Sequence, residues 1–150
     1  MIYLDSAATS LQKPQNVRRA VLSAMRTAAS TGRSAHAAAM RASDIVFNCR
    51  CAIAEMFSVA EPDNVVFTLN ATHALNIAIN SLVRSGTRVL VSGYEHNSVM
   101  RPLYARNAEI IIARSKLFDK DDALRAFSEN ISRSEIVICT HVSNVFGFVL

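Results

Sequence analysis

The chain has little of what marks a disulfide-bonded or metal-binding protein. It holds three cysteines, no tryptophan and four glycines in 150 residues. An odd number of cysteines does not suggest a disulfide framework. Cys49 and Cys51 lie two apart in a predicted helix and so face different sides, which argues against a shared metal. We therefore expect no metal site, and a reducing compartment such as the cytoplasm.

Long apolar runs and dense positive charge are also missing. No segment approaches the roughly 18 apolar residues of a membrane span, and residues 1–5 lack the basic start of a signal peptide. The net charge is +4, without a basic stripe or a known nucleic-acid-binding signature. These absences predict no membrane and no nucleic-acid partner, while the mild positive charge favours an anionic ligand.

What the sequence does contain is an alternation of short β-branched runs with amphipathic stretches. The predicted strands cover residues 65–68, 88–91, 109–113 and 136–139, and the predicted helices cover 35–57, 71–83, 98–105 and 121–128. This order predicts an α/β fold, with a mostly parallel sheet covered by helices. Residues 1–34 are expected to form an N-terminal arm and helix, and residues 35–150 the first part of the sheet domain.

Two packing expectations follow from the same pattern. In the helix over residues 35–57, the apolar spacing predicts an inward stripe from Ala38 through Ala42 and Ile45 to Met56. Cys139 ends a predicted buried strand and is expected to fill the core.

Three polar residues each follow one of the predicted strands. Thr72 comes after residues 65–68, His96 after 88–91 and Asn144 after 136–139. Ligands of open α/β sheets bind outside the carboxyl ends of the strands, so the three are expected near one pocket. A hydroxyl at a helix start, an imidazole and an amide suit a phosphorylated ligand with a ring.

Each of these residues also has a purely structural interpretation. Asn70 or Thr72 could simply cap the helix that follows, His96 could be a surface histidine, and Asn144 could form an Asx turn. Glu95 is expected to be solvated or paired with an arginine. No P-loop and no dinucleotide-binding glycine motif is present.

Five segments in order resemble the class V aminotransferase group of fold-type I pyridoxal-phosphate enzymes, in its cysteine desulfurase/selenocysteine lyase branch. The segments are residues 2–9 (IYLDSAAT), 32–36 (GRSAH), 66–76 (VFTLNATHALN), 95–99 (EHNSV) and 140–147 (THVSNVFG). The fold implied is the N-terminal part of the large, cofactor-binding domain. The activity implied is removal of sulfur from L-cysteine, which leaves alanine and a persulfide.

The resemblance implies a role for several residues. Ala71 and Thr72 match the phosphate-binding turn, His96 matches the catalytic histidine that stacks on the pyridoxal 5'-phosphate ring, and Asn144 matches an asparagine near the phenolic oxygen and the substrate carboxylate. Ala8 matches a small-residue loop that borders the substrate. His73 stands where the family commonly has glutamate.

The family residues that complete the chemistry are expected beyond Leu150. They include the Schiff-base lysine and the persulfide cysteine, which none of Lys13, Lys116 and Lys120 and none of the three cysteines matches. The chain is therefore expected to be an inactive N-terminal portion of a homodimeric enzyme that passes sulfur to an acceptor protein. The alternatives are a non-catalytic module that binds a phosphorylated ligand or a partner, and another class V reaction such as selenocysteine lysis or transamination.

Overall fold

The computed structural model describes residues 2–150, which form two compact units, residues 2–67 and 68–150. We call them the N-terminal unit and the sheet unit and describe each by itself. The division predicted after residue 34 concerns the domains of the family and stays a prediction. No helix among residues 2–150 is long and apolar enough to cross a membrane.

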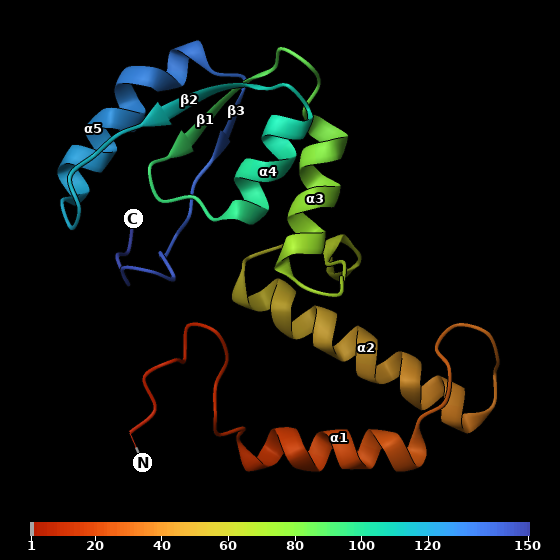
Figure 1. Cartoon of the computed structure of the whole chain (residues 1–150). Helices are drawn as coiled ribbons and strands as arrows, with labels where there is room; N and C mark the ends of the chain where they lie inside the picture. The colour runs from red at the N-terminus through yellow and green to blue at the C-terminus, as the bar shows by residue number, and fades with distance from the viewer. Residues whose placement is uncertain (1) are drawn as a thin grey trace. The chain divides into compact units, whose positions relative to one another are not determined.

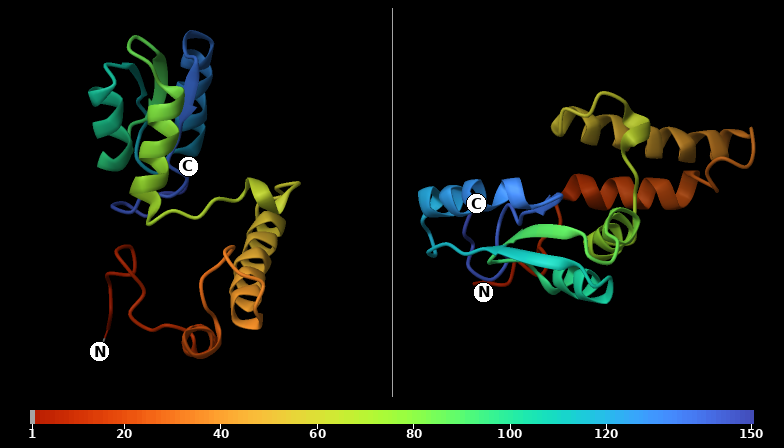
Figure 2. Two further views of the ribbon diagram at one scale, coloured as in Figure 1. Left: turned by 90° about the vertical axis from the view of Figure 1, so that its right-hand side faces the viewer. Right: turned by 90° about the horizontal axis from the view of Figure 1, so that it is seen from above.

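The N-terminal unit consists of an extended arm and two antiparallel helices. In the arm, the Tyr3 hydroxyl donates to the carbonyl of Thr9 at 2.7 Å, which closes the small-residue loop that contains Ala8. Helix α1 (Gln15–Thr27) follows Pro14, a residue suited to the start of a helix. The chain then reverses direction into α2 (Ala37–Met56), as Figures 1 and 2 show. The short 3-10 helix η1 (Pro62–Asn64) follows α2 in the same unit.

The buried face of α2 differs from the predicted stripe. Ala42 is buried as expected, but Ile45 and Met56 are exposed, and Ala39 and Ala54 are buried in their place. Arg50 lies near this face and pairs with Asp63 of η1, with 3.5 Å between nitrogen and oxygen. The prediction was wrong because helical spacing alone does not show which apolar positions of a helix meet a neighbouring element.

Residues 65–68 do not form the predicted strand. Their backbone belongs to none of the strands in the described structure, and Val66 is 74% exposed. A β-branched run becomes a strand only when a neighbour accepts and donates its backbone hydrogen bonds. The segment thus leads into the next helix as an irregular connection.

The sheet unit is built on three parallel strands in the order β2-β1-β3. Strand β1 (Arg88–Ser92) lies in the middle, beside β2 (Glu109–Ala113) and β3 (Ile136–Ile138). The register pairs Val91 with Ile112 on one side and with Ile138 on the other. All three strands therefore end at the same edge of the sheet, which confirms the predicted parallel α/β architecture.

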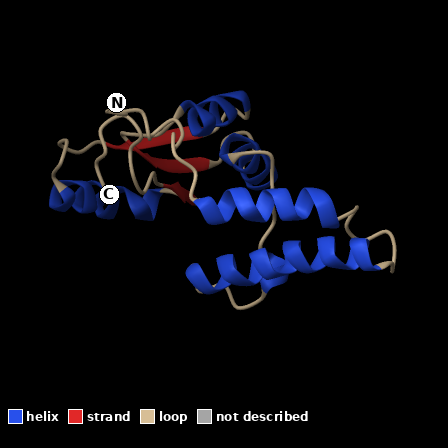
Figure 3. Ribbon diagram, turned by 90° about the horizontal axis from the view of Figure 1, so that it is seen from below, coloured by secondary structure: helices blue, strands red, loops and turns tan. Residues whose placement is uncertain are grey.

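Helices cover both faces of this sheet (Figures 1 and 3). Helices α3 (Ala71–Leu82) and α4 (Asn97–Ala105) pack on one face, where Ile79 and Leu103 meet Val89 and Val91. Helix α5 (Lys120–Asn130), followed by the 3-10 helix η2 (Ile131–Arg133), lies on the other face and packs on Leu90 through Ala126. The alternation of Val89, Leu90 and Val91 between faces is the period of two of a strand.

Candidate functional site

The start of α3 is prepared to receive an anion. The Asn70 side-chain oxygen caps the helix by accepting from the N–H of His73 at 2.9 Å. Within the described residues, the N–H groups of Ala71 and Thr72 donate to no protein acceptor, and the Thr72 hydroxyl makes no hydrogen bond. Free N–H groups at a helix start, together with the helix dipole, attract negative charge. Because Asn70 supplies the cap, the Thr72 hydroxyl remains available to a ligand.

His96 is held in one defined orientation at the start of α4. Its Nδ1 atom accepts from the backbone N–H of Ser98 at 3.1 Å and lies 2.9 Å from the Ser98 hydroxyl. A nitrogen that accepts from an N–H carries no proton, so the hydrogen of the neutral ring resides on Nε2. The imidazole therefore caps a helix with one nitrogen and keeps the other, with its proton, for a ligand.

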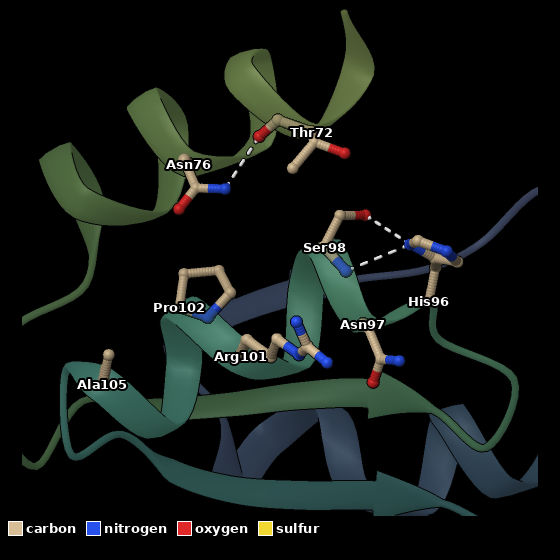
Figure 4. Close-up of a pocket in the computed structure, with 8 residues that line it drawn as sticks. All are labelled: Thr72, Asn76, His96, Asn97, Ser98, Arg101, Pro102 and Ala105. Carbon is tan, nitrogen blue, oxygen red and sulfur yellow. Dashed lines mark hydrogen bonds between the residues drawn. The ribbon is translucent and has the colours of Figure 1, made fainter.

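Thr72 and His96 line the same pocket, which lies between the start of α3 and the length of α4 (Figure 4). The pocket has a volume of about 450 Å³. Its other lining residues are Asn76, Asn97, Ser98, Arg101, Pro102 and Ala105. A volume of this order is typical of small-molecule sites. Two of the three polar residues that the sequence places after strands thus meet in one pocket.

Arg101 is a pocket residue that the sequence reasoning did not single out. It makes no ion pair within residues 2–150, so its guanidinium is free to meet an anion. The helical spacing of Asn97 and Arg101, four residues apart, is the signal that could have placed both on one face of α4.

Asn144 and Ala8 are not among the residues that line this pocket. Asn144 lies in the turn after β3, where the Ser143 hydroxyl accepts from the N–H groups of Val145 and Phe146, each at 3.3 Å. Gly147, with a φ of 64°, closes that turn. Ala8 belongs to the N-terminal unit. Their predicted roles toward the cofactor and the substrate stay predictions, and the turn itself is held by Ser143 rather than by Asn144.

Cys139 was expected to fill the core, and this prediction was wrong. It follows the last residue of β3, a strand that pairs on one side only within the described residues, and it is exposed. Partial desolvation raises the pKa of its thiol, and the nearby Glu95 carboxylate raises it further. A raised pKa leaves little reactive thiolate at neutral pH, so the thiol is poorly suited to carry sulfur.

Glu95 is half-buried and held by hydrogen bonds, and it pairs with no arginine among residues 2–150, so the expectation of a solvated or arginine-paired carboxylate was wrong. Its carboxylate accepts from the Ser92 hydroxyl at 2.5 Å and from the backbone N–H of Thr140 at 2.7 Å. It also accepts from the Thr140 hydroxyl at 2.8 Å. The partner is 45 residues away in the sequence, so no local pattern could have revealed it.

The sequence is similar to those of several proteins that carry the same name. The family described as "Aminotransferase class-V" matches residues 2–150. A "Probable cysteine desulfurase" of Synechocystis is 28% identical over 99% of this chain and 37% of its own length. Proteins of the same name from Aeropyrum pernix and Vibrio cholerae are 33% and 31% identical, and this chain covers 38% of each.

A solved structure shares the fold. The cysteine desulfurase CsdA from Escherichia coli matches 98% of this chain and 39% of its own chain, with a TM-score of 0.71 and 23% identity. The chain thus spans less than two fifths of these relatives. Since the family match extends over all described residues, the chain belongs to the class V aminotransferase family.

Proposed function

We propose that the chain supplies the phosphate end and the ring face of a pyridoxal 5'-phosphate site in a cysteine desulfurase-like enzyme. The observation that carries the proposal is the pocket shared by Thr72 and His96. A helix start with free N–H groups, a hydroxyl and an arginine fits a phosphate, and an imidazole beside it fits an aromatic ring. The residues present therefore suit the cofactor that the family uses.

Each residue would have a separate task. The N–H groups of Ala71 and Thr72, with the Thr72 hydroxyl, would hold the phosphate, and the His96 ring would stack on the pyridine ring. Asn144 would donate from its amide to the phenolic oxygen and the substrate carboxylate, and Ala8 would border the substrate. When bound, pyridoxal phosphate acts as an electron sink for bonds at the substrate's α-carbon.

His96 would also take part in moving protons. Its Nε2 atom carries the hydrogen of the neutral ring, since Nδ1 accepts from Ser98. This Nε2–H would donate a hydrogen bond to the substrate, and the ring would serve as a general acid in its doubly protonated imidazolium form. We therefore assign His96 both a stacking and a catalytic role.

The proposal for the whole protein follows the names of the relatives. L-cysteine is the proposed substrate because the similar proteins are named cysteine desulfurases. A homodimer, a cytoplasmic location and a sulfur-acceptor protein are proposed from the family resemblance. The test on the longer protein is whether L-cysteine yields alanine and sulfide in equal amounts when a thiol reductant releases the persulfide sulfur as sulfide. Formation of 3-mercaptopyruvate would indicate transamination instead.

The test on this chain is the binding of pyridoxine 5'-phosphate, which lacks the aldehyde and cannot react with lysine. We expect saturable binding, tighter than that of pyridoxine. The Thr72→Val variant, which keeps the shape but loses the hydroxyl, should bind roughly tenfold more weakly, as for a lost hydrogen bond to a charged group.

Thr87→Val is the matched control, because Thr87 precedes β1 at the opposite end of the sheet and lies outside the pocket. It should bind like the unaltered chain. Equal affinity for the phosphorylated and unphosphorylated compounds would contradict the proposed phosphate site.

A further inference from the structure

We propose that Glu95 is a positioning residue that sets the place of His96 by tying the loop after β1 to the end of β3. The inference rests on the proposed function, since it concerns the same site. Nothing in the sequence motif explains why a carboxylate should precede the histidine. The contacts of Glu95 supply the reason.

The Glu95 carboxylate joins two neighbouring strands where both end. Ser92 is the last residue of β1 and is buried, and Thr140 comes two residues after the end of β3. One oxygen of Glu95 accepts from both of these residues, at 2.5 Å from Ser92 and 2.7 Å from Thr140. The other oxygen accepts from the Thr140 hydroxyl at 2.8 Å. Three donors thus converge on one half-buried carboxylate.

These hydrogen bonds fix the backbone of the loop that carries His96. His96 follows Glu95 directly, and its Nδ1 cap on Ser98 requires the ring to stand at the start of α4. If Glu95 were released, the loop between β1 and α4 would lose its tie to β3. Thr140 lies four residues before Asn144, so the same hydrogen bonds also hold the loop that carries Asn144 beside the loop that carries His96.

Tyr94 braces the same loop from its other side. Its hydroxyl donates to the carbonyl of Ser115, in the loop after β2, at 2.9 Å. Its ring packs edge-on against Phe146 and Phe148, with centroids 6.0 and 5.6 Å apart. The loops after all three strands are therefore joined through two consecutive residues, Tyr94 and Glu95.

The donor set predicts which replacements keep the tie. A glutamine at position 95 can accept from Ser92 and the Thr140 N–H with its oxygen and donate its amide to the Thr140 hydroxyl, which can turn to accept. Alanine removes all three bonds. Glu95→Gln is therefore the conservative variant and Glu95→Ala the disruptive one.

The experiment measures the imidazole nitrogen-15 signals of His96 in the chain without cofactor, at about pH 8, where a histidine is neutral. We expect the unaltered chain and Glu95→Gln to show protonated Nε2 and unprotonated Nδ1. In Glu95→Ala the two signals should move toward the average of both tautomers, while those of His73 stay in place. Unchanged His96 signals in a folded Glu95→Ala variant, or equal shifts in Glu95→Gln, would overturn the inference.

Two further variants keep the test decisive. Glu109→Ala removes an exposed carboxylate at the amino end of β2 and should leave His96 unchanged. Thr140→Val removes one bond but keeps the backbone N–H, so it should shift His96 in the same direction by less. Should Glu95→Ala fail to fold, the contrast between Thr140→Val and Glu95→Gln decides the matter.

Binding of pyridoxine 5'-phosphate separates this inference from the proposed function. We expect Glu95→Ala to weaken binding roughly tenfold, the loss typical of hydrogen bonds to a charged group, and Glu95→Gln to restore it. If no variant and not even the unaltered chain binds the compound, the proposed function fails, while the His96 signals still decide whether Glu95 positions the ring.

Discussion

At the scale of single residues, capping a helix and binding a ligand are compatible tasks. His96 caps α4 through Nδ1, and this same bond leaves the Nε2 proton facing away from the cap. Asn70 caps α3 and so frees the Thr72 hydroxyl. Capping and ligand binding compete as interpretations when only the sequence is considered. In the structure, Asn70 caps the helix while Thr72 stays available to a ligand, and the two nitrogens of His96 divide the same two tasks between them.

The thiol of Cys139 provides a prediction at this scale. Because desolvation and the Glu95 carboxylate raise its pKa, its alkylation by iodoacetamide should have a pH midpoint above the ordinary value of 9.0. Replacing Glu95 with glutamine removes the negative charge, so the midpoint should fall. The rates are followed in a chain with Cys49→Ser and Cys51→Ser, and a midpoint below 9.0 before the replacement would contradict the assignment.

At the scale of elements, α5 shows how charge stabilises the start of a helix. The Asp119 side chain caps it by accepting from the N–H of Asp122 at 2.9 Å. Asp122 in turn accepts from the backbone N–H of Lys116 at 2.8 Å and pairs with Arg125. The bond from Lys116 is the main cause of a lowered pKa of the Asp122 carboxyl, and Arg125 lowers it further.

A lowered pKa makes the contribution of Asp122 to stability depend on pH. The folded chain favours the ionised form, so the stabilisation is present above the ordinary pKa of 3.8 and is lost as the pH falls through the lower value of the folded state. Asp122→Asn should therefore lower the thermal midpoint at pH 7, and the difference should shrink below pH 3.8. Asp121→Asn makes the same charge change in the same turn and should lower the thermal midpoint at pH 7 by less. An equal decrease for the two variants would contradict this explanation.

The elements also differ in how well the sequence predicts them. The bounds of α2, α3, α4 and β1 agree with the predicted ranges within two residues, because caps and helical spacing are local signals. The strand expected at 65–68 is not formed, since a strand depends on a neighbour that can lie anywhere in the chain. The face of α2 was also mispredicted, because the burial of alanines depends on what packs against them.

At the scale of the whole molecule, an apolar groove lies open beside β3. It has a volume of about 150 Å³ and is lined by side chains of α3 and β3, among them Leu75, Leu82 and Val137. Within the described residues, β3 pairs only with β1, so its other edge offers free backbone groups. Exposed edges of this kind favour association between chains.

We therefore predict that the isolated chain self-associates and that Val137→Lys reduces this association. A lysine on an edge strand opposes pairing because its charge must stay in water. Light scattering during size-exclusion chromatography measures the mass, and Leu124→Lys, a replacement on exposed α5, is the control. A monodisperse monomer for the unaltered chain would show that the open edge does not drive association.

The sequence by itself determined the order of the elements, the parallel sheet and the placement of Thr72 and His96 at helix starts. The helix starts depend on hydrogen bonds between residues a few positions apart, and the parallel sheet is indicated by the alternation of strands and helices along the chain. Only the tertiary structure decided that these two residues share a pocket, that Arg101 lies beside them, and that Glu95 reaches Thr140. Such contacts join residues far apart in the chain, and they depend on where the folded sheet brings the strand ends together.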